Sequence, residues 1–388
     1  MRRPAPSAVA AVLAVAALLA GCGGGGSDGG ASANDPFYGV ISAEPLPGGA
    51  QLARLGDGGV GTLRINFAWG SVQSGPNAPY DWGHYDPVVR AAAENGVHVL
   101  ATMYSTPSWA ASTPEVPPLG SDLPGFEEFA RTAVKRYGSG GTFWEDHPDV
   151  PKLPITDWQL WNEPNSPLFW KPTPDAGQYL SLLRAFNSAV KGSDPSARVV
   201  LGGLFPTPAG GISLEDFLSA LYDAGGRDLF DAVAVHPYSL TPRKALDRVK
   251  QARDVMRRFG DADKPIWITE VGWASRGTPP GVVVGLSGQA DYVRQTFELA
   301  AAERDRLGIA GVVWYSLNDT PGPLWVGHCG LFRLDGSPKP AWEAFAQVAG
   351  DSAQRSVRRQ ASTGSTPEPR SRLPSQRPGS CCSSGSRT

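Results

Sequence analysis

Between Pro36 and Gly350, short apolar runs rich in β-branched residues alternate with longer segments of helical periodicity. Near-continuous apolar runs are typical of parallel strands that are covered on both faces. Eight alternations over about 315 residues predict an α/β fold, the (β/α)8 TIM barrel, which takes about 250 residues plus insertions. A doubly wound open sheet is the alternative, but no Gly-x-Gly-x-x-Gly turn follows the first run. The predicted strands are Tyr38–Ser42, Thr62–Phe67, His98–Met103, Trp158–Trp161, Arg198–Gly202, Ala232–Val235, Ile266–Thr269 and Gly311–Tyr315.

The segments between these runs carry signals for the ends of helices. Thr173-Pro174-Asp175 offers an N-cap, a first-turn proline and an acid, and Gly192 lies just past the expected end of that helix. Ser287 and Gly308 are expected to bound a second helix, and Thr241-Pro242 to begin a third. Helices between strands are what a barrel of this class requires.

The N-terminal residues combine a positive pair, an apolar run and a cysteine. Arg2 and Arg3 precede the apolar run Ala8–Ala20, as in a secretory signal peptide. A helix of that run would be about 20 Å long, too short to span a hydrocarbon core of about 30 Å. The junction Leu19-Ala20-Gly21-Cys22 resembles the lipobox of bacterial lipoproteins, which implies cleavage before Cys22 and lipidation of that residue. An ordinary cleaved secretory signal is the alternative.

These features divide the chain into four parts. Residues 1–21 are predicted to be a lipoprotein signal peptide, and residues 22–35 a lipidated cysteine with a flexible, Gly-rich linker. Residues 36–350 form the predicted barrel domain. Residues 351–388 contain ten Ser and seven Arg with few large apolar side chains, so this tail is expected to be disordered. We therefore expect an extracytoplasmic protein, either anchored to the bacterial cell membrane by its lipid or secreted.

Charge and ligand spacing exclude several classes of partner. The formal net charge is −2, whereas nucleic-acid recognition requires clustered Lys and Arg. The five His are scattered, and no Cys or His pattern has the spacing of a metal site, so neither a metal nor another cofactor is expected. We expect a monomer.

Two glutamates stand at the ends of predicted strands. Trp161-Asn162-Glu163-Pro164 ends the fourth, and Ile266-Trp267-Ile268-Thr269-Glu270 ends the seventh. Active sites of TIM barrels gather at the C-terminal ends of the strands. If Ile266 and Ile268 fill the barrel interior, the alternation of a strand predicts that Glu270 emerges at its mouth. Two carboxyl groups in one cleft suit the cleavage of a glycosidic bond, one as an acid and the other as a nucleophile.

With these motifs the sequence resembles the clan A glycoside hydrolases, which are (β/α)8 barrels with an Asn-Glu pair on strand four and a nucleophilic Glu on strand seven. The resemblance covers about Phe37–Ala349. It is closest to the branch of β-xylosidases, α-L-iduronidases and bacterial exopolysaccharide endoglycosidases, with the cellulase-like branch second. It implies that Glu163 is the acid/base and Glu270 the nucleophile of a retaining hydrolase acting on O-glycosidic bonds of a β-linked poly- or oligosaccharide. Their carboxyl groups should then lie about 5–5.5 Å apart.

The resemblance also implies supporting roles. Asn162 would hydrogen-bond the 2-hydroxyl of the sugar being cleaved. Arg64, in Leu63-Arg64-Ile65-Asn66-Phe67, would steady the nucleophile and keep it ionised. His236 and Tyr238, in Val235-His236-Pro237-Tyr238, would lie near the nucleophile, with Tyr238 donating to it.

On strand eight, Trp314 matches the aromatic floor beneath that sugar, and Trp314–Tyr315 is the candidate for the cis peptide often found there in the clan. One motif departs from the pattern. Many members carry His at the end of strand three, whereas this chain reads Met103-Tyr104-Ser105.

Further aromatic residues lie where loops leave the predicted strands. Trp69, Trp109 and Trp273 could provide platforms for the apolar faces of sugar rings, and core packing is the alternative for each. Asn318 could bind a sugar hydroxyl or cap a helix. For the whole chain, the alternative to an enzyme is a non-catalytic glycan-binding lipoprotein on a TIM-barrel scaffold.

Overall fold

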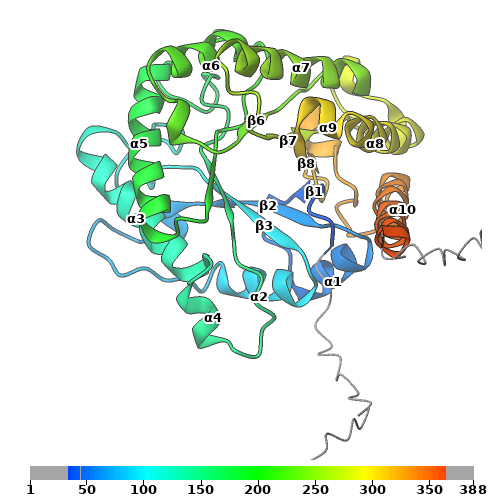
Figure 1. The fold of residues 1–388 in the computed structure, drawn as a ribbon, viewed down its shortest axis with the longest axis horizontal. Coiled ribbons are helices and arrows are strands. Elements are labelled where there is room, and N and C mark those ends of the chain that lie inside the picture. Colours follow the sequence, from blue (N-terminus) through cyan, green and yellow to red (C-terminus); the bar gives the residue numbers. More distant parts are fainter. Residues whose placement is uncertain (1–33, 44, 364–388) are drawn as a thin grey trace, which may run out of the picture. The chain divides into compact units, whose positions relative to one another are not determined.

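The computed structural model describes residues 34–43 and 45–363, which form a barrel of eight parallel strands ringed by helices (Figure 1). The strand order is β5-β4-β3-β2-β1-β8-β7-β6, and an isolated parallel bridge between Val200 and Ala232 joins its two ends. The predicted (β/α)8 barrel is therefore confirmed. The strands are β1 (Tyr38–Ile41), β2 (Thr62–Phe67), β3 (His98–Met103), β4 (Asp157–Leu160), β5 (Arg198–Val200), β6 (Val233–Val235), β7 (Ile266–Val271) and β8 (Ile309–Trp314).

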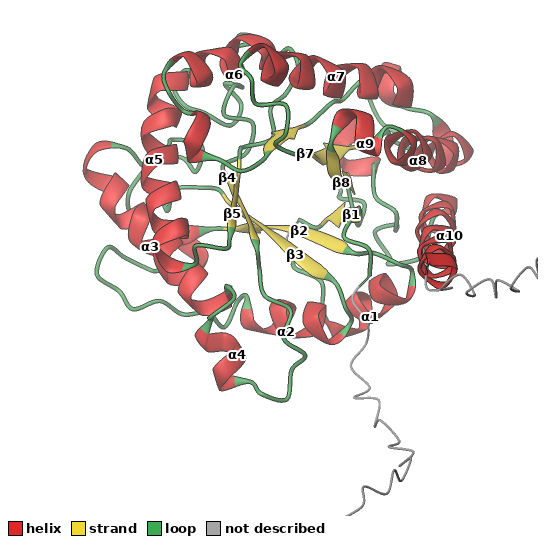
Figure 2. Cartoon of the chain, viewed as in Figure 1, coloured by secondary structure: helices red, strands yellow, loops and turns green. Residues whose placement is uncertain are grey.

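Helices cover the outside of the barrel (Figure 2). Their apolar faces pack on the outward apolar side chains of the strands. The α-helices of the described residues are α1 (Gly49–Asp57), α2 (Asp86–Glu94), α3 (Leu123–Tyr137), α4 (Thr142–Asp146), α5 (Ala176–Ser193), α6 (Leu214–Asp223), α7 (Pro242–Arg258), α8 (Gly285–Ala302), α9 (Arg304–Leu307) and α10 (Pro340–Thr363).

The helix signals were read correctly in part. Thr241 caps α7, since its side chain accepts from the backbone N–H of Lys244. In α5 the cap is Asp175 rather than Thr173, so the expected start is wrong by two residues. Helix α8 begins before Ser287, but Gly308 ends the following helix α9 in the left-handed conformation that glycine adopts without strain.

The core has two parts, one on each side of the strands. The larger cluster lies between strands and helices, and it includes Ile266 and Ile268. The smaller one lies inside the barrel, where Trp267 meets apolar side chains of β3, β5 and β6. The expectation that the two isoleucines fill the barrel interior is therefore wrong, because β7 presents Trp267 and Thr269 to the interior instead.

Several predictions concern residues that the structure does not describe. The predicted signal peptide, Cys22 and most of the linker lie outside the described residues, as do residues 364–388. Helix α10 continues past Gly350 to Thr363, so residues 351–363 are helical rather than part of a disordered tail. Within the described part of the chain, no helix combines the length and hydropathy needed to cross a bilayer.

A buried ion pair joins the loop after β8 to the start of α10. Lys339 Nζ lies 2.6 Å from Asp319 Oδ1, and the two side chains are 1% and 5% exposed. Lys339 also donates to Ser275 Oγ and to the carbonyl of His328, at 3.0 and 3.1 Å. The pair thus ties the loops after β7 and β8 together near the C-terminal ends of the strands.

Replacing Lys339 by methionine should lower the free energy of unfolding by about 3–5 kcal/mol, because Asp319 would keep a buried charge without its partner. Urea unfolding of the single variant measures this. The double variant Lys339→Met/Asp319→Leu should recover part of the loss, since both charges leave together. Wild-type stability in the single variant would contradict any stabilisation by the pair.

Candidate active site

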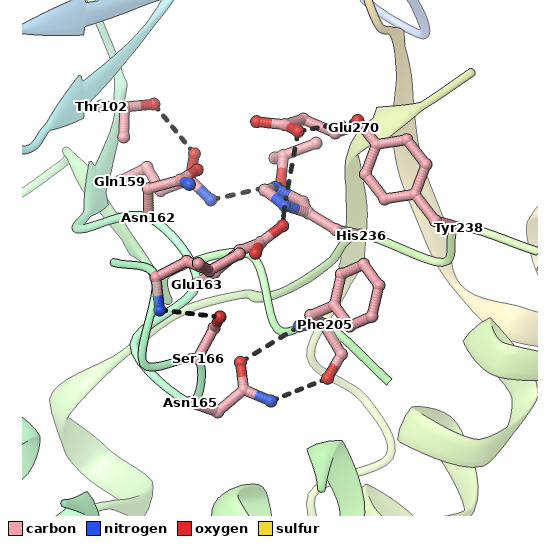
Figure 3. Close-up of polar contacts among 12 residues, drawn as sticks. Thr102, Gln159, Asn162, Glu163, Asn165, Ser166, Phe205, His236, Tyr238 and Glu270 are labelled. Atoms are coloured by element: carbon pink, nitrogen blue, oxygen red, sulfur yellow. Dashed lines mark hydrogen bonds and ion pairs between the residues drawn. The ribbon is translucent and has the colours of Figure 1, made fainter. Parts of the chain in front are cut away.

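Glu163 follows β4 on a segment with unusual backbone geometry. Trp161 and Glu163 have φ angles of 67° and 40°, in the left-handed region that residues other than glycine rarely occupy. Asn162 between them forms a parallel bridge with Gly203 after β5. The carbonyl of Glu163 accepts from the N–H of Ser166 (Figure 3). Strained backbone of this kind clusters at functional sites, and here it directs the carboxyl group toward the centre of the barrel mouth.

Glu270 reaches the same centre from β7. The pairing of β7 with β8 is irregular between Ile268 and Val271, so the strict alternation of the strand is interrupted there. Thr269 bonds to groups inside the barrel and Glu270 turns toward Glu163 (Figure 3). The sequence placed Glu270 at the mouth correctly, but this irregularity, and not a regular alternation after inward isoleucines, is the reason.

The two carboxyl groups face each other across a short gap. Oxygens of Glu163 and Glu270 and a ring nitrogen of His236 lie within 4.8 Å of one another. The side chains of the two glutamates are 8% and 10% exposed, so both are largely buried. His236, fully buried, places Nδ1 2.8 Å from Glu163 Oε1 and 3.6 Å from Glu270 Oε2. One oxygen of each carboxyl group thus lies within 4.8 Å of the other, which is compatible with the separation of about 5–5.5 Å used by retaining glycosidases.

Arg64 and Tyr238 hold Glu270 from two sides. Arg64 Nη1 donates to Glu270 Oε1 at 2.6 Å, and Tyr238 Oη donates to Oε2 at 2.9 Å. Arg64 Nη2 donates to Asn162 Oδ1 at 3.0 Å, which links β2 to the Glu163 segment. The predicted positions of Arg64, Asn162, His236 and Tyr238 around the two carboxyl groups therefore agree with the geometry.

The surroundings drive the pKa values of the two glutamates apart. Burial raises the pKa of Glu163, with the charge of Glu270 acting in the same direction, and the hydrogen bond from His236 offsets only part of the shift. Burial also opposes ionisation of Glu270. The electrostatic effects of His236 and Arg64, and the hydrogen bonds from Arg64 and Tyr238, outweigh burial and lower the pKa of Glu270. As the pH rises, Glu270 therefore ionises first and Glu163 keeps its proton longer.

A polar layer that the motifs did not reveal lies beneath the carboxyl groups. Thr102 on β3, Gln159 on β4 and Thr269 on β7 are fully buried and bonded to one another or to Arg64 and His236. The signal in the sequence was their polarity within otherwise apolar strands, since buried polar groups need hydrogen-bond partners.

Gly203 is a second residue that sequence reasoning missed. A Cβ atom at this position would lie 2.0 Å from His236 Nε2, so only glycine leaves room for the imidazole. Gly203→Ala should therefore displace His236 and reduce turnover, with a loss of about 1–3 kcal/mol in the free energy of unfolding. Steady-state kinetics and thermal unfolding measure both effects. Gly140→Ala, where a Cβ meets nothing within 4 Å, is the matched control, and equal behaviour of the two variants would contradict the steric argument.

Tyr315, directly after β8, and not Trp314, faces the carboxyl groups. Trp314 is fully buried and donates through Nε1 to the carbonyl of Cys329. The Tyr315 ring packs edge-on against Tyr238, and burial together with the charge of Glu270 raises the pKa of Tyr315. The cis peptide bond is Tyr315–Ser316 rather than Trp314–Tyr315. Both predictions for Trp314 are thus one residue out of place. For the aromatic side chain the reason is that neighbouring residues of a strand face opposite sides.

The other predicted binding residues lie apart from the carboxyl groups. Trp69 and Trp273 are 2% and 0% exposed and belong to the core, so core packing, and not an open sugar platform, describes them. Trp109 is partly exposed and, with Trp69 and Tyr80, lines a cavity of about 310 Å³. Asn318 accepts from Gln51 Nε2 and lines a separate cavity of about 590 Å³.

The spacing of Glu163, His236 and Glu270 would also suit a metal ion. Their donor atoms, however, already have partners: Glu270 accepts from Arg64 and Tyr238, and His236 contacts Glu163. A permanent cation beside the site disfavours a second one. The residues present therefore fit acid–base chemistry better than metal binding.

The chain combines a (β/α)8 barrel with opposed glutamates after β4 and on β7, an arginine from β2 and a His-x-Tyr segment after β6. This is the arrangement that the resemblance to clan A glycoside hydrolases implies. No family model matches the chain. A curated β-xylosidase of Geobacillus stearothermophilus is 27% identical over 213 residues, covering 48% of this chain and 40% of that protein.

Solved structures give the same class. A family 39 glycoside hydrolase from Bacteroides cellulosilyticus WH2 is similar with a TM-score of 0.64 and 25% identity, over 81% of this chain and 64% of that one. A monomeric β-xylosidase from Caulobacter crescentus CB15 has a TM-score of 0.58 and 19% identity, over 82% and 69% of the two chains. The chain spans less than half of the curated relative and under two thirds of the Bacteroides structure. The resemblance to clan A (β/α)8 glycoside hydrolases is confirmed.

Proposed function

We propose that the protein is a retaining glycoside hydrolase that acts on a β-linked poly- or oligosaccharide. The observation that carries the proposal is the pair Glu163 and Glu270, whose carboxyl oxygens lie within 4.8 Å and whose pKa values are shifted in opposite directions. Such a pair can supply a proton and a nucleophile to one glycosidic bond. The names of the relatives support this class of reaction.

In the first step, Glu270 attacks the anomeric carbon while the proton of Glu163 passes to the leaving oxygen, so one C–O bond forms and another breaks. In the second step, the Glu163 carboxylate takes a proton from water, which attacks the same carbon and releases Glu270. Arg64 and Tyr238 orient the attacking oxygens of Glu270. Two inversions return the product to the β configuration.

Asn162 is placed to bind the sugar during both steps. Its Oδ1 accepts from Arg64 Nη2, and this fixes the side-chain amide with Nδ2 as the free donor. We assign Nδ2 to the 2-hydroxyl of the sugar, where a hydrogen bond strengthens in the transition state. Tyr315 takes the place proposed from the sequence for Trp314 as the aromatic side of this sugar site.

We propose β-xylosides as the first substrates to test. Two of the similar proteins are named β-xylosidases. The test is incubation of the purified full chain with 4-nitrophenyl β-D-xyloside and xylobiose, followed by NMR of the first anomer released. Retention predicts the β anomer first. Release of the α anomer first would overturn the retaining mechanism, and glycan binding without any product from a wider panel of β-glycosides would favour the non-catalytic alternative.

For its location, we propose an exported, monomeric lipoprotein held at the bacterial cell membrane through Cys22. The proposal rests on the order of the positive pair, apolar run and lipobox-like cysteine in the sequence. Labelled palmitate should enter the wild-type protein and not Cys22→Ala, which should no longer fractionate with membranes. Equal labelling of both would overturn the assignment of Cys22.

A further inference from the structure

A series of hydrogen bonds lies under the active site. The chemistry of its side chains determines which atom donates and which accepts in each bond. The series begins at Gln159, whose Oε1 accepts from Arg64 Nε at 2.8 Å and from Thr102 Oγ1 at 2.9 Å. Its Nε2 donates to the carbonyl of Leu201 at 3.0 Å. A guanidinium can only donate and a carbonyl can only accept, so the two ends of the Gln159 amide cannot be exchanged.

The orientation of the Gln159 amide also sets the donor and acceptor roles at Thr269. Gln159 Nε2 also donates to Thr269 Oγ1 at 3.3 Å, and Thr269 Oγ1 lies 3.0 Å from His236 Nε2. Gln159 Nε2 can only donate, so of the two partners that Thr269 Oγ1 has among the described residues, only His236 Nε2 can accept the hydroxyl proton. A neutral imidazole has one donor and one acceptor nitrogen. If Nε2 accepts from Thr269, Nδ1 carries the proton.

The proton on Nδ1 faces Glu163. His236 Nδ1 lies 2.8 Å from Glu163 Oε1, so this oxygen accepts in either protonation state of the glutamate. When Glu163 is protonated, the proton is then held on Oε2, the oxygen that does not face His236. With the opposite tautomer, Glu163 Oε1 would have to donate its proton to His236, and that proton would be turned away from a substrate.

We propose that Gln159, acting through Thr269, is a positioning residue that fixes the tautomer of His236 and so keeps the acid proton of Glu163 on Oε2. The catalytic consequence rests on the proposed function, in which Glu163 protonates the leaving oxygen. The tautomer itself is a property of the folded protein and does not depend on any activity.

Other charged and titratable groups also face Glu163, and none of them can replace this arrangement. Arg64 and Tyr238 bond to Glu270, on the far side of the gap. Tyr104, after β3, packs edge-on against Trp161. Among the hydrogen bonds of the described residues, the bond to the Glu163 carboxyl group comes from His236. The groups that act electrostatically on or beside Glu163 are His236, Glu270, Arg64, Tyr104, Tyr238 and Tyr315.

The direct test is nitrogen NMR of the full chain labelled at histidine. The sequence has five His, so the signals can be resolved, and the His236→Gln variant assigns the resonance that disappears. The wild-type protein should show His236 protonated at Nδ1. Protonation at Nε2 would overturn the proposal whether or not the protein hydrolyses any substrate. Conversely, an inactive protein with the Nδ1 tautomer would refute the proposed function and leave the tautomer assignment standing.

Two variants test the role of the chain. Gln159→Glu is sharpest, because a carboxylate only accepts: it should draw the proton of Thr269, so that His236 Nε2 becomes the donor. Turnover of xylobiose, which needs a proton on its leaving oxygen, should then fall about tenfold more than turnover of 2,4-dinitrophenyl β-D-xyloside, which does not. An equal fall for both substrates, or an unchanged tautomer, would contradict the proposal.

Two variants of Thr269, one with and one without the hydroxyl, test the same chain if Gln159→Glu fails to fold. Thr269→Ser keeps the hydroxyl and should keep both the tautomer and the pH profile of wild type. Thr269→Val has almost the same volume and no hydroxyl, so His236 should show both tautomers and xylobiose turnover should fall selectively. Thermal unfolding verifies that both variants are folded. Loss of the Nδ1 tautomer in Thr269→Ser, or its retention in Thr269→Val, would overturn the assignment.

Discussion

Glu270→Ala is expected to lower turnover of 4-nitrophenyl β-D-xyloside by about 10⁴-fold or more, since the variant removes the group that forms the covalent intermediate. In the structure, Arg64 and Tyr238 each bond to one carboxylate oxygen of Glu270 and so orient the group. The lowered pKa of Glu270 keeps it ionised. Steady-state release of nitrophenol measures the loss. The variant leaves a small space beside the anomeric carbon that an external nucleophile can enter.

Azide provides the decisive observation for this variant. It should restore part of the turnover of Glu270→Ala and give the α-glycosyl azide, because a single displacement inverts the configuration. The matched control is Glu298→Ala on the exposed face of α8, which should behave as wild type with and without azide. Undiminished turnover in Glu270→Ala would remove this residue from the mechanism and with it the double displacement.

The barrel was predictable because its signal is distributed over the whole chain. Eight apolar runs separated by helical segments leave few ways to cover both faces of a parallel sheet, and all eight strands lie within two residues of their predicted bounds. The two glutamates were also predictable, because each stands at the end of a strand, where a barrel places its chemistry. The N-caps of helices were predicted less well. Thr241 is the cap of α7, as predicted, whereas the cap of α5 is Asp175 and not Thr173.

The errors within the barrel strands concern which way a side chain points. Reading β7 as a regular strand put Ile266 and Ile268 inside the barrel, yet the irregular pairing with β8 turns Glu270 inward after Thr269. At the end of β8 the prediction was also wrong by one residue, because Tyr315 and not Trp314 lies beside the site. Sequence spacing records alternation but not where it is interrupted, and an interruption depends on contacts with neighbouring strands.

The polar layer under the site was beyond motif reasoning for a different reason. Thr102, Gln159 and Thr269 come from three strands, and each alone reads as an ordinary polar residue in an apolar run. Only the closed barrel brings them together beneath Arg64 and His236. Gly203 belongs to the same group, since its importance lies in the imidazole that occupies the space of its missing side chain.

Glu163→Gln is expected to separate substrates by their leaving groups. Xylobiose should lose about 10²–10⁴ in kcat/KM, the usual contribution of a general acid, because its leaving alkoxide needs a proton. 2,4-Dinitrophenyl β-D-xyloside should keep most of its kcat/KM, since its leaving group needs none. Its kcat should still fall, because the base that activates water is also gone. Azide should raise that kcat and give the β-glycosyl azide, the opposite anomer from Glu270→Ala.

The pH profile gives an independent measure of the same residue. Wild-type activity should fall at high pH as Glu163 loses its proton, and burial places this limb above the ordinary range of a glutamate. The acid limb should lie below that range, because activity is lost only when Glu270 becomes protonated through its lowered pKa. In Glu163→Gln the alkaline limb should disappear while the acid limb remains. A variant that keeps both limbs would show that another group is the acid, and a control at Glu298→Gln should leave the whole profile in place.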